Sequence, residues 1–89
     1  IYENRAKIVF LAIGSNLGDR FKNIELAKIA LLLNKIKILK TSSFYETLSW
    51  PDAKKPKFLN IILKVETNIH QVKLLSICNE IEKSLGRKS

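Results

Sequence analysis

The sequence predicts an α+β fold in which two helices pack on one face of a mostly antiparallel sheet. Two stretches, residues 20–33 and 71–85, repeat apolar side chains at helical spacing, which indicates two amphipathic helices. Three other stretches, residues 7–13, 36–46 and 58–67, are rich in β-branched or aromatic residues and are predicted strands. The order strand, helix, strand, strand, helix favours a layer of helices on a sheet.

Composition limits the class of protein. The 89 residues are 46% hydrophobic and 27% charged, which is typical of a globular protein and sufficient for one domain over residues 1–89. A net charge of +8 attracts phosphate-bearing partners, nucleotide or nucleic acid, although a solvated lysine-rich surface is the simpler explanation. Apolar runs are far shorter than a membrane span, so we expect no membrane partner. The lone Cys78 fits a reducing compartment, and we expect a cytoplasmic protein.

The first strand and the first helix are joined by a glycine-containing turn. Residues 7–13 form a continuous apolar run, so we expect a strand that is buried on both faces and central in its sheet. Residues 14–20 make the turn, and Asp19 is the predicted N-cap of a helix over about residues 20–33, which stops at residues 34–35. The residues predicted to face the core are Ile24, Ala27 and Leu31, with Phe21 on the same side.

The remaining elements follow by the same reasoning. The second strand, residues 36–46, is predicted to be half-exposed and near a sheet edge, and the second helix, residues 71–85, to end at Gly86. In the third strand we expect Leu59, Ile61, Leu63 and Val65 to pack under the helices, and Phe58, Asn60, Ile62, Lys64 and Glu66 to form the other face. The side chains that the second helix is expected to bury are Val72, Leu75, Cys78 or Leu74, Ile81 and Leu85.

This order matches the ferredoxin-like βαββαβ unit except for its final strand. We therefore predict a ferredoxin-like βαββα(β) sandwich whose last strand is missing from this chain. The absence of Met, even at position 1, agrees with this expectation, because it suggests a piece of a longer chain.

The connection between the second and third strands is the first candidate site. It is longer than a chain reversal requires, and it holds both prolines and the only tryptophan of the chain. It places Thr47, Trp50, Phe58 and Asn60 around one bend, where they could line an aromatic-walled pocket for a flat heterocyclic ligand. We expect no metal ligands, because His70 is the single histidine and no carboxylate pair has a suitable spacing.

The end of the second helix is the other candidate site. Asn79 and Glu82 are three residues apart and share one helix face, and Arg87 follows the helix end. Together they could hold the adenosine and phosphates of a nucleotide, although spacing alone favours an ordinary exposed helix face.

Six ordered motifs carry a family resemblance that covers nearly the whole chain. They are Ala-Ile-Gly-Ser-Asn-Leu-Gly-Asp-Arg at 12–20, Ser-Ser-Phe-Tyr-Glu-Thr at 42–47, Pro-Lys-Phe-Leu-Asn at 56–60, Glu-Thr at 66–67, Ile-Glu at 81–82 and Leu-Gly-Arg at 85–87. In this set the chain resembles the N-terminal portion of 6-hydroxymethyl-7,8-dihydropterin pyrophosphokinase (HPPK) of folate biosynthesis, without the Asp-x-Asp metal segment of that family.

The resemblance implies a function and a set of site residues. It implies transfer of diphosphate from ATP to 6-hydroxymethyl-7,8-dihydropterin, with Mg²⁺ held by ligands beyond Ser89 and no catalytic residue in this chain. It also implies possible fusion, or proximity, to another folate-pathway enzyme. The residues that match the pterin site of the family are Gly14, Thr47, Leu48, Trp50, Phe58 and Asn60. Those that match its ATP site are Leu75, Asn79, Glu82 and Arg87.

The chain departs from the family pattern at two positions, and two alternative functions stay open. The family often has Pro where Leu48 stands and Gln where Asn79 stands. A basic RNA-binding module has a similar strand order, but its third strand usually carries more aromatics and glycine than residues 58–67 do. A pterin-binding pseudo-enzyme without chemistry is the second alternative.

Overall fold

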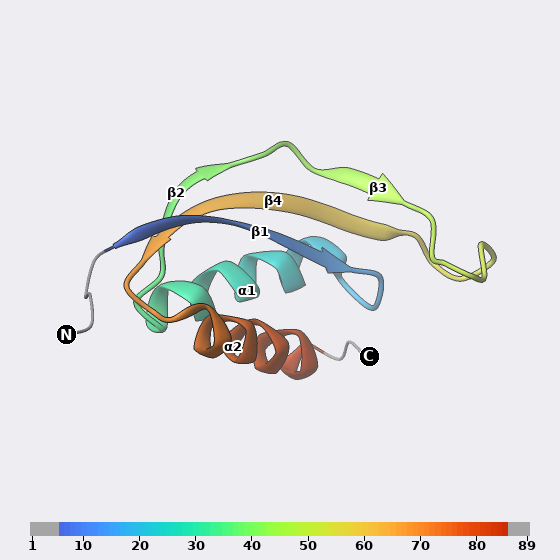
Figure 1. The fold of residues 1–89 in the computed structure, drawn as a ribbon. Coiled ribbons are helices and arrows are strands. Elements are labelled where there is room, and N and C mark those ends of the chain that lie inside the picture. The colour runs from blue at the N-terminus through green and yellow to red at the C-terminus, as the bar shows by residue number, and fades with distance from the viewer. Residues whose placement is uncertain (1–5, 86–89) are drawn as a thin grey trace.

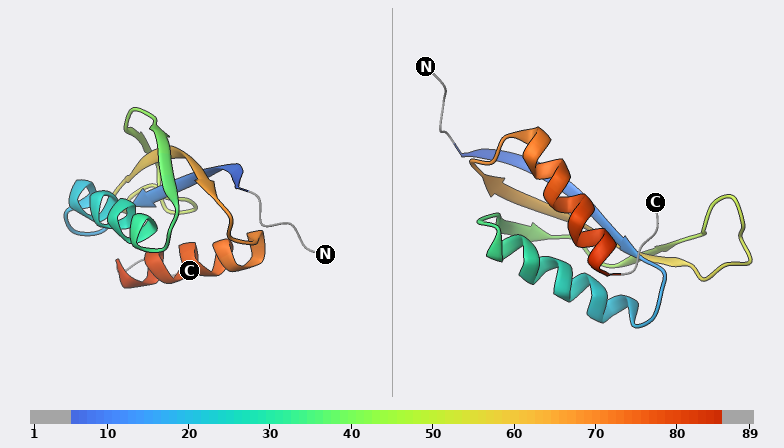
Figure 2. Two further views of the ribbon diagram at one scale, coloured as in Figure 1. Left: turned by 90° about the vertical axis from the view of Figure 1, so that its left-hand side faces the viewer. Right: turned by 90° about the horizontal axis from the view of Figure 1, so that it is seen from below.

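The computed structural model describes residues 6–85 (Figure 1). In chain order, its elements are β1 (Lys7–Ser15), α1 (Arg20–Leu33), β2 (Lys37–Thr41), β3 (Tyr45–Thr47), β4 (Phe58–Thr67) and α2 (Gln71–Ser84). The two helices lie on the same face of the sheet, and no helix of the described residues covers the opposite face (Figures 1 and 2). The predicted α+β fold is confirmed.

β4 is the central strand of the sheet. It pairs antiparallel with β1 along one side and with β2 and β3 along the other. β1 and β2 therefore run parallel with β4 between them and are connected by α1, which is the split βαβ arrangement of ferredoxin-like folds. Successive side chains of β4 point to opposite faces of the sheet. Ile61, Leu63 and Val65 point to the helix side and are fully buried there, as predicted.

The first strand differs from the prediction. In the part of the chain that the structure describes, β1 is an edge strand, and only its helix-facing side is buried. Phe10 points to the open face and is 67% exposed, and Ile8 is exposed on the same face. A run of apolar residues reveals that both faces of a strand are apolar, but it does not reveal whether anything covers the second face.

The predicted second strand, residues 36–46, is in fact two short edge strands, β2 and β3. A register shift between Ile38 and Lys40 bends β2, and the ladder breaks after Thr41. At the break the Ser42 backbone N–H donates to the Ile62 carbonyl at 2.9 Å, and the Ser42 hydroxyl accepts from the Ile62 N–H at 2.8 Å. A side-chain oxygen therefore replaces a backbone carbonyl in the pairing, which the alternation pattern could not predict.

α1 has the predicted bounds and caps. The Asp19 carboxylate accepts from the Lys22 backbone N–H at 3.0 Å, which satisfies a donor of the first turn. At the other end Lys35 adopts a φ of 64°, in the left-handed region, and the chain leaves the helix there. The predicted core residues Ile24, Ala27 and Leu31 are buried. Phe21 instead lies half-exposed, with its ring centroid 4.9 Å from that of Phe44.

α2 agrees with the prediction in its second half, at Cys78, Ile81 and Leu85, and differs from it in its first half. It begins after His70, whose Nδ1 accepts from the Val72 backbone N–H at 3.2 Å. Val72 and Leu75, expected in the core, are exposed. The side chains that face the core are Leu74, Ile77, Cys78, Ile81 and Leu85. Both sets fit a spacing of three and four residues, so only packing decides between them. The predicted stop at Gly86 lies outside the described residues.

Neither of the helices within residues 6–85 combines the length and the apolar content that crossing a membrane would need.

Candidate functional site

Gly14 and Asn60 face each other on the open side of the sheet. They are directly paired across β1 and β4, and Tyr45 of β3 is paired with Asn60 on its other side. A Cβ atom built on Gly14 would lie 2.5 Å from Asn60 Oδ1 and 3.4 Å from a ring carbon of Phe58. Only glycine leaves room for the Asn60 amide at this point of the sheet.

Three acceptors orient the Asn60 amide. Its Nδ2 donates to Thr47 Oγ1 at 2.9 Å, to the Tyr45 carbonyl at 3.3 Å and to the Phe58 carbonyl at 3.4 Å. Exchanging the amide oxygen and nitrogen would bring an oxygen against two carbonyls, so the nitrogen must face β3. The structure therefore brings together Gly14, Thr47, Phe58 and Asn60, four of the six residues predicted for a pterin site.

Leu48 and Trp50 lie on the loop that leaves β3. Leu48 is exposed, and the Trp50 side chain is 92% exposed, so its indole contacts almost nothing in residues 6–85. The loop projects beyond the sheet as an arm (Figure 1). The structure thus does not bring Trp50 against Asn60, and the aromatic-walled pocket expected around Trp50 is not formed by the described residues.

The base of this arm is anchored. Ser49 is buried, and its hydroxyl donates to the Pro56 carbonyl at 2.5 Å across the loop. Asn16, from the turn after β1, donates to Ser49 Oγ at 3.3 Å and to the Pro56 carbonyl at 3.5 Å. Sequence reasoning overlooked Asn16 and Ser49, because contacts between such distant segments leave no periodic signal in the sequence.

A second anchor lies on the helix side of the sheet. Arg20 Nη1 donates to Glu46 Oε2 at 2.8 Å and to the Lys57 carbonyl at 3.0 Å. The hydrogen bond and the charge of Arg20 lower the pKa of the Glu46 carboxyl below its ordinary value. Glu46 therefore stays ionised through neutral pH.

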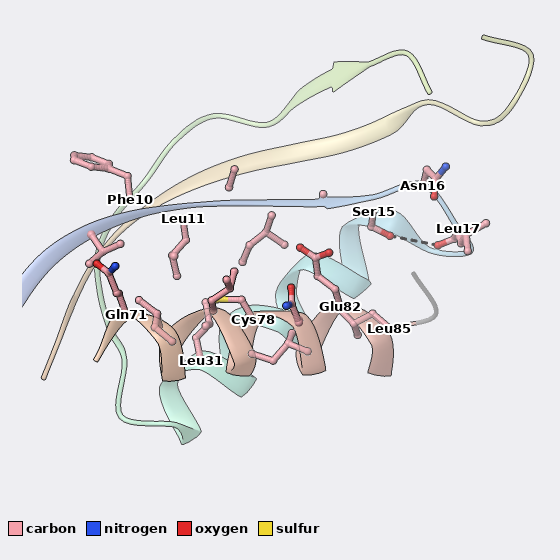
Figure 3. Close-up of a pocket in the computed structure, with 18 residues that line it drawn as sticks. Phe10, Leu11, Ser15, Asn16, Leu17, Leu31, Gln71, Cys78, Glu82 and Leu85 are labelled. Atoms are coloured by element: carbon pink, nitrogen blue, oxygen red, sulfur yellow. Dashed lines mark hydrogen bonds between the residues drawn. The ribbon is translucent and has the colours of Figure 1, made fainter. Parts of the chain in front are cut away.

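A mostly apolar groove of about 330 Å³ runs between β1 and α2 (Figure 3). Its lining includes three of the four residues predicted for an ATP site, Leu75, Asn79 and Glu82. The Glu82 carboxylate points from α2 toward β1 (Figure 3). Arg87, the fourth, lies outside the described residues. Residues from β1 and the turn after it complete the wall: Val9, Phe10, Leu11, Ala12, Ile13, Gly14, Ser15, Asn16 and Leu17.

Cys78 also lines this groove and is half-buried. Burial, and secondly the negative charge of Glu82, raise the pKa of its thiol above the ordinary value. A raised pKa disfavours the reactive thiolate, and Cys78 packs against the hydrophobic core, as predicted.

The two candidate sites meet at the end of β1. Gly14 packs under Asn60 on the open face and also lines the groove. Asn16 lines the groove and hydrogen-bonds the base of the arm. A ligand over Asn60 and a ligand in the groove would therefore share the Gly14–Asn16 segment as a common wall.

No group of three or more His, Cys, Asp or Glu side chains that could hold a metal ion occurs within residues 6–85. The described residues therefore do not fit a metal centre.

The described residues define a ferredoxin-like α+β fold with two adjoining candidate sites, one polar on the sheet face and one apolar beside a helix. A family model described as 7,8-dihydro-6-hydroxymethylpterin-pyrophosphokinase (HPPK) matches residues 10–89. The chain belongs to the HPPK family.

Curated relatives agree with this membership. The chain is 39% identical over 80 residues to the 2-amino-4-hydroxy-6-hydroxymethyldihydropteridine pyrophosphokinase of Aquifex aeolicus, covering 90% of this chain and 49% of the relative. It is 39% identical over 88 residues to the folic acid synthesis protein fol1 of Schizosaccharomyces pombe, covering 97% of this chain but 12% of the relative. It is 42% identical over 81 residues to the bifunctional protein FolKE of Lactococcus lactis, covering 89% and 23%. The chain thus spans about half the length of the Aquifex relative and less of the other two.

Proposed function

We propose that the whole protein to which this chain belongs transfers diphosphate from ATP to 6-hydroxymethyl-7,8-dihydropterin in folate biosynthesis. The observation that carries the proposal is the meeting of two sites at the Gly14–Asn16 segment, because a transfer between two small molecules requires them to be bound side by side. Family membership supports the identity of the two substrates.

The polar site suits the pterin. Asn60 would present its Oδ1 as an acceptor to the amide-like edge of a pterin ring, and its Nδ2 would donate to that edge in exchange for one of its three acceptors within the protein. Its orientation is fixed by Thr47 and by the Tyr45 and Phe58 carbonyls, so little conformational freedom is lost when the ligand binds. The Phe58 ring, on the same face of β4, would stack on the ligand. Leu48 and Trp50 belong to this proposal as residues that the projecting arm would bring to the ligand.

The groove suits ATP. Leu75 and the apolar wall of β1 would take the adenine, and Asn79 and Glu82 would hydrogen-bond the adenosine. Arg87 would contact the phosphates. The net charge of +8 favours the approach of a polyanion of this kind.

The transfer forms one bond to phosphorus and breaks another. The pterin hydroxyl oxygen forms a bond to the β-phosphorus of ATP, the bond from that phosphorus to the oxygen bridging to the α-phosphorus breaks, and AMP leaves while the hydroxyl proton is lost. Mg²⁺ would neutralise phosphate charge in the whole protein. The residues described here would contribute binding and orientation.

We also propose that the whole protein is cytoplasmic and is fused or adjacent to a second folate-pathway enzyme. A cytoplasmic protein agrees with the single cysteine. Fusion to a second folate-pathway enzyme is supported by the bifunctional name of the Lactococcus relative.

The test uses the full-length protein, ATP and 6-hydroxymethyl-7,8-dihydropterin, with AMP measured by chromatography. We expect one AMP for each pterin diphosphate formed. Pterin binding without AMP release would overturn the transfer and leave the pseudo-enzyme alternative. An RNA-binding module is not favoured, since the relatives reported above are named for folate or pterin chemistry.

A further inference from the structure

Arg20 contacts both ends of the arm formed by residues 48–57. One nitrogen, Nη1, donates to the carboxylate of Glu46, two residues before the arm, and to the carbonyl of Lys57, the last residue of the arm. Arg20 is the first residue of α1 and follows the capping residue Asp19, so its backbone is fixed by the helix. A side chain that starts from a helix thus connects the two ends of the arm.

The register of β3 shows what this contact supports. Glu46 is paired with Leu59 on the helix side of the sheet, and its neighbours Tyr45 and Thr47 therefore point to the open face. Those neighbours supply two of the three acceptors that orient the Asn60 amide. Arg20 accordingly holds β3 from the side opposite Asn60, without contacting the open face.

β3 needs such a support. It contains three residues, all exposed, and within residues 6–85 it pairs with β4 alone, through three residue pairs. An edge strand of this length is marginal by itself. If β3 frayed, Thr47 Oγ1 and the Tyr45 carbonyl would move away from Asn60, and the amide would lose its fixed orientation.

We propose that Arg20 is a positioning residue for pterin binding: through Glu46 and the Lys57 carbonyl it fixes β3, and through β3 it fixes the Asn60 amide. This inference rests on the proposed function. An exposed ion pair alone contributes little to folding stability. The effect of Arg20 should therefore appear in the affinity for pterin more than in the stability of the protein.

The experiment compares three variants of the full-length protein by steady-state kinetics with each substrate varied in turn. They are Arg20→Ala, Glu46→Gln and the double variant. Each single change should raise KM for the pterin about five- to tenfold and leave KM for ATP within about twofold. The double variant should be no worse than Arg20→Ala, because both changes break the same contact.

The control is Lys28→Ala. Lys28 lies on the same helix as Arg20, but its ion pair, at 3.3 Å, is with Glu25 of that helix and not with a residue of β3. It should change neither KM. Equal pterin KM values for wild type and both single variants would overturn the role of Arg20, and so would equal losses for pterin and ATP. If Arg20→Ala did not fold, Glu46→Gln alone would decide, because it keeps the shape of the side chain.

Pterin binding by the wild type and by the variants separates the role of Arg20 from the proposed function. A wild-type protein that binds no pterin in calorimetry would overturn the proposed function, and the role of Arg20 in pterin binding would be overturned with it. A wild type that binds pterin normally, with variants that bind equally well, would remove only the role of Arg20.

Discussion

Asn60 lies over Gly14 so closely that a Cβ atom on Gly14 would come within 2.5 Å of Asn60 Oδ1. The two residues are paired across β1 and β4, although they are far apart in the sequence. The floor of the candidate pterin site is therefore a bare backbone, and the polar group above it is held by β3.

Gly14→Ala should weaken pterin binding at least tenfold while the protein stays folded. The clashing atom is the end of a side chain that can rotate away, so the cost to folding should stay below about 2 kcal/mol. Rotation would take Asn60 from its partner Thr47, and isothermal titration of the full-length variant would measure the loss. Gly18→Ala is the control, because Gly18 has a φ of 60° and nothing near its Cβ position. It should cost about 1–2 kcal/mol of stability and leave pterin affinity unchanged. Unchanged affinity in Gly14→Ala would contradict this account.

Asn60→Asp should abolish measurable pterin binding and lower stability by about 1–3 kcal/mol. The change replaces an N–H donor by an oxygen that faces the Tyr45 and Phe58 carbonyls. Urea denaturation and calorimetry would measure the two effects. Glu66→Gln, on the same face of β4 but at its other end, is the matched charge control and should alter neither quantity. Retained binding in Asn60→Asp would exclude the Asn60 amide as the group that hydrogen-bonds the edge of the pterin ring.

Leu63→Ala should lower the free energy of unfolding by about 2–5 kcal/mol, because Leu63 is fully buried under the helices. Ile62→Ala changes the next residue, which faces the open side and is 39% exposed, and should cost under about 1 kcal/mol. Chemical denaturation of both variants tests the assignment of the two faces of β4. Similar losses would mean that the open face is covered as well in the whole protein.

Alkylation of Cys78 should report on the groove. The raised pKa of its thiol disfavours the thiolate, so the rate should be below that of a free cysteine at the same pH and should increase as the pH is raised. Glu82→Gln removes a negative charge and should speed the reaction. Saturating ATP should slow it severalfold, measured by peptide mass spectrometry of the Cys78 peptide. ATP binding without any protection of Cys78 would place the nucleotide elsewhere.

The Glu46 carboxyl should titrate below its ordinary value of 4.5. Since its folded-state pKa is lowered, the contribution of the Arg20 contact is present above pH 4.5 and is lost as the pH falls further. Carbon-13 NMR of the carboxyl group would give the midpoint, and Arg20→Ala should move it up toward 4.5. A midpoint unaffected by that substitution would mean that the ion pair does not persist in solution.

Several elements could be predicted because their signals are local. The bounds of α1 follow from the Asp19 cap and from a stop near Lys35, and the two faces of β4 follow from strict alternation. The face of α2 could be predicted only in part: Cys78, Ile81 and Leu85 do face the core, but Leu75 and Leu74 fit the helical period equally well and differ only in what packs against them. The neighbours of Trp50 in the sequence predict that its side chain lines the pocket. In the structure its loop projects from the sheet, and the side chain is exposed to solvent.

By itself, the sequence determined the α+β class, most element bounds and the family motifs, because caps, turns and periodicity act over a few residues. Only the tertiary structure decided that Gly14 lies under Asn60 and that Arg20 grips β3, since these contacts depend on which strands become neighbours. Strand neighbours are chosen by the packing of the whole sheet against both helices, and no short stretch of sequence contains that information.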